Sequence, residues 1–490
     1  MSESGIAQKA VKATKWSLVT QVASKLITPI TTLVLAHLLA PEAFGVVALV
    51  TMVTSFADLF ADAGFQKYLI QHEYESKSHY RLSCDVAFWT NTIISFLLWG
   101  VIALSGDWLA VALGDASIGP AIVVACASLP LTSAASVQTA VYQRAFDFKT
   151  LFYSRVGSSL LILLVSVALA LLNWGYWSMI AGTVASNLLL AVWLTAKSEW
   201  KPSLRYSIAE LKSMLSFSAW TLVEQLSIWL TNWIGAFILG AFMNAYYLGL
   251  YNTSITLINS VVAIVTGAVN PIVFASLSRM QDNRDRFDSA FYSMQKYLGI
   301  AVVPIAVALF VYSDAVVGLY LGNQWLEASL FLGLYSLTSA FVVVFGHICS
   351  DAYRAMGKPK YSLIAQIGFL VFLIPGLLVG ANYGFGVLSV SVPIARLAGC
   401  LVTHFLICKL LMRLSPLRML WNMRWVYLAA IIVGGLSYAA VNTLGLGYWA
   451  QCGMFFVSVA GYLGLCFAFK DTRSTLVDLL KKFGIHGSRA

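Results

Sequence analysis

Lys25 and Arg396 are the two basic residues of this 490-residue chain that fall inside long apolar stretches. Each lies about ten residues into its stretch, which is roughly 15 Å along a helix and near the middle of a ~30 Å hydrocarbon core. A charge at that depth costs a few kcal/mol or more and usually faces a wet cavity. The two cations therefore predict a lining for an anionic substrate. The alternative is an internal ion pair with an acid in the membrane.

Helix spacing extends the site around Lys25. Gln21, Lys25, Thr28 and Thr32 recur at intervals of three and four residues and would form one polar stripe on a helix. We expect Gln21 and Thr28 to line the substrate path together with Lys25.

Three acids in or near apolar stretches are candidates for ion coupling: Asp58, Glu224 and Asp314. A carboxylate in the membrane can carry a coupled proton or bind a cation such as Na⁺. It can equally neutralise Lys25 or cap a helix end. The seven cysteines show no CxxC spacing, so no metal site and no cofactor are expected beyond this coupling ion.

The composition identifies the class of protein that must position these groups. Hydrophobic residues make up 59% of the chain and charged residues only 11%, whereas a soluble chain carries about 25% charged residues. The sequence predicts an all-α polytopic membrane protein with about fourteen spans of the required length. The spans are expected at 16–38, 43–63, 83–105, 118–138, 153–172, 175–196, 216–240, 250–276, 297–320, 328–349, 361–381, 386–408, 425–442 and 448–469.

The basic residues give the orientation of these spans. With the N-terminus inside, 29 of the 31 Lys and Arg residues fall in the inner segments and none in the outer loops. The positive-inside rule therefore predicts a multi-pass membrane protein with both termini in the cytoplasm. This distribution accounts for the net charge of +10 and leaves no case for nucleic acid as a partner.

The stretch 16–45 occurs twice in the chain. Without a gap, 8 of its 30 residues are identical to those of 220–249, including Trp16/Trp220, Gln21/Gln225 and Gly45/Gly249. Internal repeats are typical of secondary transporters. Because the repeat spans six helices, an even number, both copies have the same orientation in the membrane. We predict an N-terminal six-helix lobe (1–200), a C-terminal six-helix lobe (201–412), and two additional spans with an amphipathic cytoplasmic tail (413–490).

The second copy of the repeat carries different side chains on the equivalent helix face. Gln225, Trp229 and Asn232 occupy the helix face that matches the stripe of the first copy, and Trp229 replaces Lys25. One lobe is thus expected to present a charged wall to the cavity between the lobes, and the other an aromatic wall. We expect all three residues to bind substrate.

Six motifs, in this order, resemble those of Wzx-type polysaccharide flippases, in the branch of colanic-acid and teichuronic-acid exporters, within the multidrug/oligosaccharidyl-lipid/polysaccharide exporter superfamily. They are LLAPEAFGVVAL (38–49), DAGFQKYLIQ (62–71), YQRAFDFK (142–149), FASLSRMQDNRDRF (274–287), LGNQW (321–325) and YRAMGKPK (353–360). The resemblance implies two six-helix lobes and translocation of an undecaprenyl-pyrophosphate-linked oligosaccharide repeat unit. It also implies membrane lipids, a polysaccharide polymerase and a chain-length regulator as partners.

The leading prediction is a flippase that works by alternating access through a cationic cavity between the lobes, in the assembly of exopolysaccharide, capsule or O-antigen. One alternative is a cation-coupled multidrug exporter of the same superfamily, which favours carboxylates over midplane cations. Another is a membrane glycosyltransferase or polysaccharide polymerase. Such an enzyme needs catalytic residues on a sizeable loop, and the predicted outer loops are short. We therefore expect no enzymatic activity and no catalytic residues.

Overall fold

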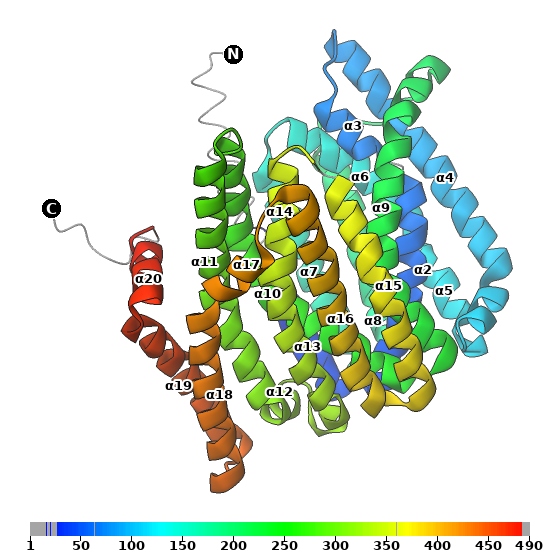
Figure 1. Cartoon of the computed structure of the whole chain (residues 1–490). Coiled ribbons are helices and arrows are strands. Elements are labelled where there is room, and N and C mark those ends of the chain that lie inside the picture. Colours follow the sequence, from blue (N-terminus) through cyan, green and yellow to red (C-terminus); the bar gives the residue numbers. More distant parts are fainter. Residues whose placement is uncertain (1–15, 17–19, 21–26, 63, 359, 483–490) are drawn as a thin grey trace. The chain divides into compact units, whose positions relative to one another are not determined.

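The fold is known from a computed structural model that describes residues 16, 20, 27–62, 64–358 and 360–482, in which every regular element is a helix (Figure 1). Thirteen of the described helices are long and apolar enough to cross a membrane. Ile27–Leu38 is the described part of the first predicted span, and the thirteen others lie at the remaining predicted spans. The predicted fold class, an all-α polytopic membrane protein, is confirmed.

The helices follow one another with short connections, as expected where every backbone N–H and C=O must be satisfied within its own segment. The first eight labelled elements are α2 (Pro41–Asp62), α3 (Phe65–Gln71), α4 (Lys77–Ala112), η1 (Ala116–Ile118), α5 (Gly119–Cys126), α6 (Leu129–Arg144), α7 (Phe148–Leu171) and α8 (Tyr176–Lys197). The next eight are α9 (Ile208–Phe242), α10 (Ala245–Arg279), α11 (Arg284–Val311), α12 (Ser313–Tyr320), η2 (Asn323–Ala328), α13 (Ser329–Phe341), η3 (Val342–His347) and α14 (Ile348–Ala355). The last seven are α15 (Lys360–Tyr383), α16 (Phe385–Ile407), η4 (Cys408–Met412), α17 (Pro416–Asn422), α18 (Arg424–Leu444), α19 (Tyr448–Ala468) and α20 (Lys470–Lys482).

Short polar side chains fix where several helices begin. Asp147 accepts a hydrogen bond from the Thr150 backbone N–H at 3.1 Å, and Ser207 accepts one from Glu210 at 3.3 Å. These caps satisfy backbone donors that a helix start leaves without a partner. The helix that Ser207 opens then continues for 35 residues into the membrane span.

Two predicted spans are interrupted. The span expected at 118–138 is built from η1, α5 and α6, with a break before Pro130, whose missing N–H is tolerated in a first helical turn. The span expected at 297–320 divides at Tyr312 into α11 and α12. Hydropathy averages over such breaks, because the residues on both sides are equally apolar.

The chain folds as two compact units, residues 1–252 and 253–490. In the first unit α9 packs against α2, α3 and α4, so it belongs with the N-terminal helices by contact. In the second unit α18 and α19 pack against each other and both contact α11. The lobe limits predicted at 200 and 412 rest on the repeat rather than on contact, and they stay a prediction.

Equivalent helices pack in equivalent pairs within the two units. In the first unit α4 contacts α6, α6 contacts α8, and α7 and α8 form a closely packed hairpin. In the second unit α11 contacts α13, α13 contacts α16, and α15 and α16 form the corresponding hairpin. This is the pattern expected of an internal repeat.

Within the first unit, two glycines of the repeat make reciprocal contacts. A Cβ added to Gly45 would lie 1.8 Å from the carbonyl oxygen of Ala245, and one added to Gly249 would lie 1.9 Å from that of Pro41. Pro41 and Ala245 are themselves 204 residues apart, as Gly45 and Gly249 are. A reciprocal contact of this kind is what a two-fold rotation between two copies produces.

Candidate functional site

Arg396 lies near the middle of α16, where a guanidinium group must find its partners inside the membrane. Its planar group stacks on the ring of Tyr335 at 3.8 Å and donates to the Tyr335 hydroxyl. It also donates to Ser339 Oγ at 3.2 Å. Tyr335 and Ser339 are four residues apart on α13, so a single helix face holds the arginine.

No acid neutralises Arg396 among the described residues. The ion pairs found there join His79 to Glu210, Arg284 to Asp288, Lys296 to Asp471 and Arg354 to Asp351. The Nε of Arg396 is buried and makes no hydrogen bond in the described structure. The group is thus held by neutral partners that leave several of its N–H donors unused, the Nε–H among them. This arrangement favours the anion-binding interpretation of Arg396 over the ion-pair alternative.

The partner helix of Arg396 changes its winding one turn further on. After Phe341 the chain passes through six residues of π-helix, Val342–His347, before α-helical geometry resumes at Ile348. Short π-helical segments are rare and are frequent at functional sites. The helix that carries Tyr335 and Ser339 is therefore followed directly by a π-helical segment, an irregularity that is frequent at functional sites.

In the first unit, Trp229 and Asp58 make contacts to neighbouring helices. The Trp229 indole N–H on α9 donates to Ser55 Oγ on α2 at 3.0 Å, and its ring packs against Phe56 at 4.8 Å. One turn along α2, Asp58 accepts a hydrogen bond of 2.7 Å from the Thr132 hydroxyl on α6. A line of polar contacts thus joins three spanning helices, with a carboxylate at one end.

The other predicted site residues differ in how the structure places them. Gln21 and Lys25 lie outside the described residues, as does the side chain of Glu224. Thr28 and Asn232 are exposed and Gln225 is half-buried. Asp314 is exposed in the first turn of α12, where its charge favours the helix N-terminus.

Sequence reasoning missed the groups that hold the charged residues. Tyr335, Ser339 and Thr132 are neutral and lie far in sequence from the residues they contact. A search of each span for hydroxyl groups at helical spacing would have found the first two. No sequence signal pairs them with Arg396 in particular.

The fold is that of a polytopic membrane protein that carries charged and polar groups inside its spans. A family model described as "Polysaccharide biosynthesis protein" matches residues 34–330, more than half of the chain. The chain belongs to this family.

Two of the relatives are named for the biosynthesis or transport of a polysaccharide. The chain is similar to the succinoglycan biosynthesis transport protein ExoT of Rhizobium meliloti, with 23% identity over 67% of the chain and 65% of the relative. The match thus spans slightly less than two thirds of that relative's length. It is also similar to the lipopolysaccharide biosynthesis protein WzxC of Escherichia coli, with 20% identity over 82% of the chain and 81% of the relative.

Among solved structures, the lipid II flippase MurJ in an inward closed conformation has the same fold. The TM-score is 0.73 at 13% sequence identity, over 92% of this chain and 98% of that one. An inward-facing multidrug resistance transporter of the MATE family, in the MOP superfamily, gives a TM-score of 0.61 at 14% identity, over 82% and 94%. At these identities the likeness shows the fold alone. The family match confirms the predicted membership of a polysaccharide biosynthesis family.

Proposed function

We propose that this protein is a flippase that moves an undecaprenyl-pyrophosphate-linked oligosaccharide repeat unit across the bacterial inner membrane for surface polysaccharide assembly. The observation that carries the proposal is Arg396, a cation in mid-span whose hydrogen-bond partners among the described residues are all neutral. A pyrophosphate or an acidic sugar supplies the missing negative charge. The family and the flippase fold support the same substrate class.

The mechanism we propose needs no covalent chemistry. The polyprenyl tail stays in lipid, while the polar head crosses through a wet cavity between the two lobes by alternating access. Arg396, with Lys25, Gln21 and Thr28, would face the pyrophosphate, and Gln225, Trp229 and Asn232 would face the sugars. A polysaccharide polymerase and a chain-length regulator are the proposed partners on the product side.

Deletion followed by lipid analysis tests the function directly. Without the flippase, the lipid-linked repeat unit accumulates on the inner leaflet and surface polysaccharide is lost. Reintroducing the gene restores both. A deletion strain that keeps its surface polysaccharide and accumulates no lipid-linked repeat, but becomes sensitive to drugs, would favour a multidrug exporter. The MATE-like fold makes that exporter the second candidate.

We further propose that Asp58 couples transport to a gradient of H⁺ or Na⁺. The proposal is supported by the hydrogen bond that Asp58 on α2 accepts from Thr132 on α6, a contact between two spanning helices. Asp58→Asn keeps the size of the side chain and an acceptor oxygen but removes the charge. Flipping in proteoliposomes should then no longer respond to an imposed ion gradient. Glu42→Gln, at an exposed acid, is the control. An unchanged response in Asp58→Asn would transfer the role to Glu224 or Asp314.

The orientation of the chain is a separate proposal. The distribution of Lys and Arg places both termini in the cytoplasm. Reporter fusions after Lys201 and after Arg418 should report the cytoplasm, and a fusion after Asn323 should report the outer side. A periplasmic signal at Lys201 would overturn the scheme.

A further inference from the structure

The short helix α17 connects two spanning segments at the membrane surface. The π-helical segment η4 ends the preceding span at Met412, and α18 begins the next span at Arg424. The chain between them therefore stays at the same end of the two spans. Ser415 caps α17 by accepting a hydrogen bond from the Arg418 backbone N–H at 3.3 Å. A helix in this place lies where lipid headgroups are found.

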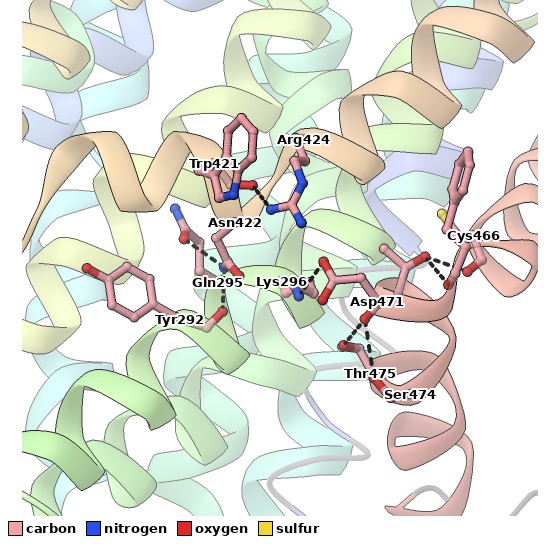
Figure 2. Close-up of polar contacts among 12 residues, drawn as sticks. Tyr292, Gln295, Lys296, Trp421, Asn422, Arg424, Cys466, Asp471, Ser474 and Thr475 are labelled. Atoms are coloured by element: carbon pink, nitrogen blue, oxygen red, sulfur yellow. Dashed lines mark hydrogen bonds and ion pairs between the residues drawn. The ribbon is translucent and has the colours of Figure 1, made fainter.

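One face of α17 is fixed to the protein. Met419 and the adjoining Met423 are fully buried. The Asn422 amide donates to the Tyr292 carbonyl oxygen at 2.8 Å and to Gln295 Oε1 at 3.2 Å, both on α11 (Figure 2). Two buried methionines and two part-buried hydrogen bonds therefore fix this face of α17 and leave the opposite face as a defined outer face.

Next to these contacts, the same helix α11 holds the start of α20. Lys296 is largely buried and donates to Asp471 at 3.1 Å (Figure 2). Gln295, which contacts Asn422, and Lys296, which pairs with Asp471, are consecutive residues of α11. The contacts therefore hold α17 and the start of α20 at the same height along α11. The position of α17 along α11 is therefore set by the fold.

The outer face of α17 combines exposed apolar groups with two arginines. Leu417 is 77% exposed and Trp421 is 67% exposed. With Leu420, Arg418 and Arg424 they line an open recess of about 550 Å³. Apolar groups this exposed are unfavourable against water, but they suit the membrane interface, where Trp is enriched and cations reach the headgroups.

Aromatic rings hold both arginines, and no carboxylate pairs with either in the described part of the chain. The Arg424 guanidinium stacks on Trp421 at 4.5 Å and donates to its carbonyl oxygen at 3.0 Å (Figure 2). Arg418 lies over the Tyr292 ring at 4.5 Å. The acid near Arg418 is Asp288, which is already paired with Arg284 at 3.0 Å. The recess thus presents two positive charges that form no ion pair within the described part of the chain.

We propose that this recess binds the headgroup phosphate of an anionic phospholipid in the cytoplasmic leaflet. Arg418 and Arg424 would contact the phosphate, while Leu417, Leu420 and Trp421 pack against the glycerol and the first acyl carbons. Charge complementarity and the place of α17 at the end of two spans select a lipid over a protein partner. The site lies apart from Arg396 in the sequence and needs no glycan, so it does not depend on the proposed transport function.

Native mass spectrometry of the purified full-length protein tests the assignment. The wild-type protein should bind dioleoyl phosphatidylglycerol roughly ten-fold or more tightly than dioleoyl phosphatidylcholine, the expectation for two basic residues at a lipid surface. Arg418→Gln/Arg424→Gln should abolish this preference. Arg81→Gln/Arg205→Gln removes the same charge from exposed positions in the first unit and should leave the preference intact.

Several outcomes would overturn the site. These are equal binding of the two lipids by the wild-type protein, and an unchanged preference in the Arg418/Arg424 double variant. Displacement of phosphatidylglycerol by an equal amount of undecaprenyl pyrophosphate would instead assign the recess to the transport substrate. If the double variant does not fold, as judged by its thermal midpoint, the lipid preference of the single variant Arg418→Gln is measured instead. Its side chain is exposed, and its loss should remove part of the preference.

Discussion

Replacing Arg396 by alanine is expected to lower glycan export roughly 10- to 100-fold at equal expression. A hydrogen bond to a charged group contributes about 1.5–3 kcal/mol, and each 1.36 kcal/mol is a factor of ten in rate. Arg396 as a whole is half-buried, and Tyr335 and Ser339 do not use all of its N–H donors, so the group has donors available for substrate. Export is measured as surface polysaccharide together with the lipid-linked repeat left on the inner leaflet.

Conservative variants separate the roles of charge and geometry. Arg396→Lys keeps the charge but loses the planar group that stacks on Tyr335, so we expect partial function. Tyr335→Phe keeps the ring and removes only the hydroxyl acceptor, so its effect should be smaller than that of Arg396→Ala. Arg205→Ala removes an exposed arginine elsewhere and should export normally.

A purely structural role for Arg396 makes a different prediction. In that case the alanine variant would lose thermal stability, and inorganic pyrophosphate would stabilise the wild-type protein and the variant equally. If Arg396 binds the anion, pyrophosphate should raise the thermal midpoint of the wild-type protein alone. From the sequence, we expect Lys25→Ala to impair export in the same way as Arg396→Ala. Wild-type export by both alanine variants, at normal expression, would refute the cationic path.

The spans were predictable from sequence because the membrane imposes one requirement on all of them. Each needs about twenty apolar residues in a helix whose backbone is internally bonded. The break at Tyr312 and the winding change to π-helix at 342–347 depend on contacts between helices. Local composition does not record such contacts, and so the breaks were not predicted.

The candidate site was predictable only in part, for a related reason. Charges are rare in spans, so Arg396 and Asp58 stand out in the sequence. Their partners do not, because Tyr335, Ser339 and Thr132 resemble many other hydroxyl residues in the same helices. The partner of Trp229 illustrates why the sequence does not identify such contacts. Ser55 is one polar residue on a helix face that also carries Thr51 and Asp58, and only the fold selects it.

The second large effect is expected at the paired glycines of the repeat. Gly45→Ala and Gly249→Ala would each place a methyl group within 2 Å of a backbone oxygen, at 1.8 Å and 1.9 Å. Backbone cannot move away by changing a rotamer, so α2 and α10 would have to separate. Overpacking usually costs about 1–3 kcal/mol and occasionally more, and we expect the upper end of that range. The yield of folded protein and the thermal midpoint measure the loss.

Matched glycines elsewhere make this test specific. Gly100 in α4 and Gly453 in α19 have no neighbouring atom within 4 Å of an added Cβ. Alanine there should be neutral or stabilising, since it favours a helix over glycine by about 1 kcal/mol. The repeat adds a further requirement. The offset of 204 residues relates Gly45 to Gly249 and Pro41 to Ala245, so the contact of Gly45 with Ala245 is equivalent to the contact of Gly249 with Pro41. The two substitutions should therefore destabilise the protein by similar amounts. A large effect at one position with none at the other would mean that the two contacts are not equivalent.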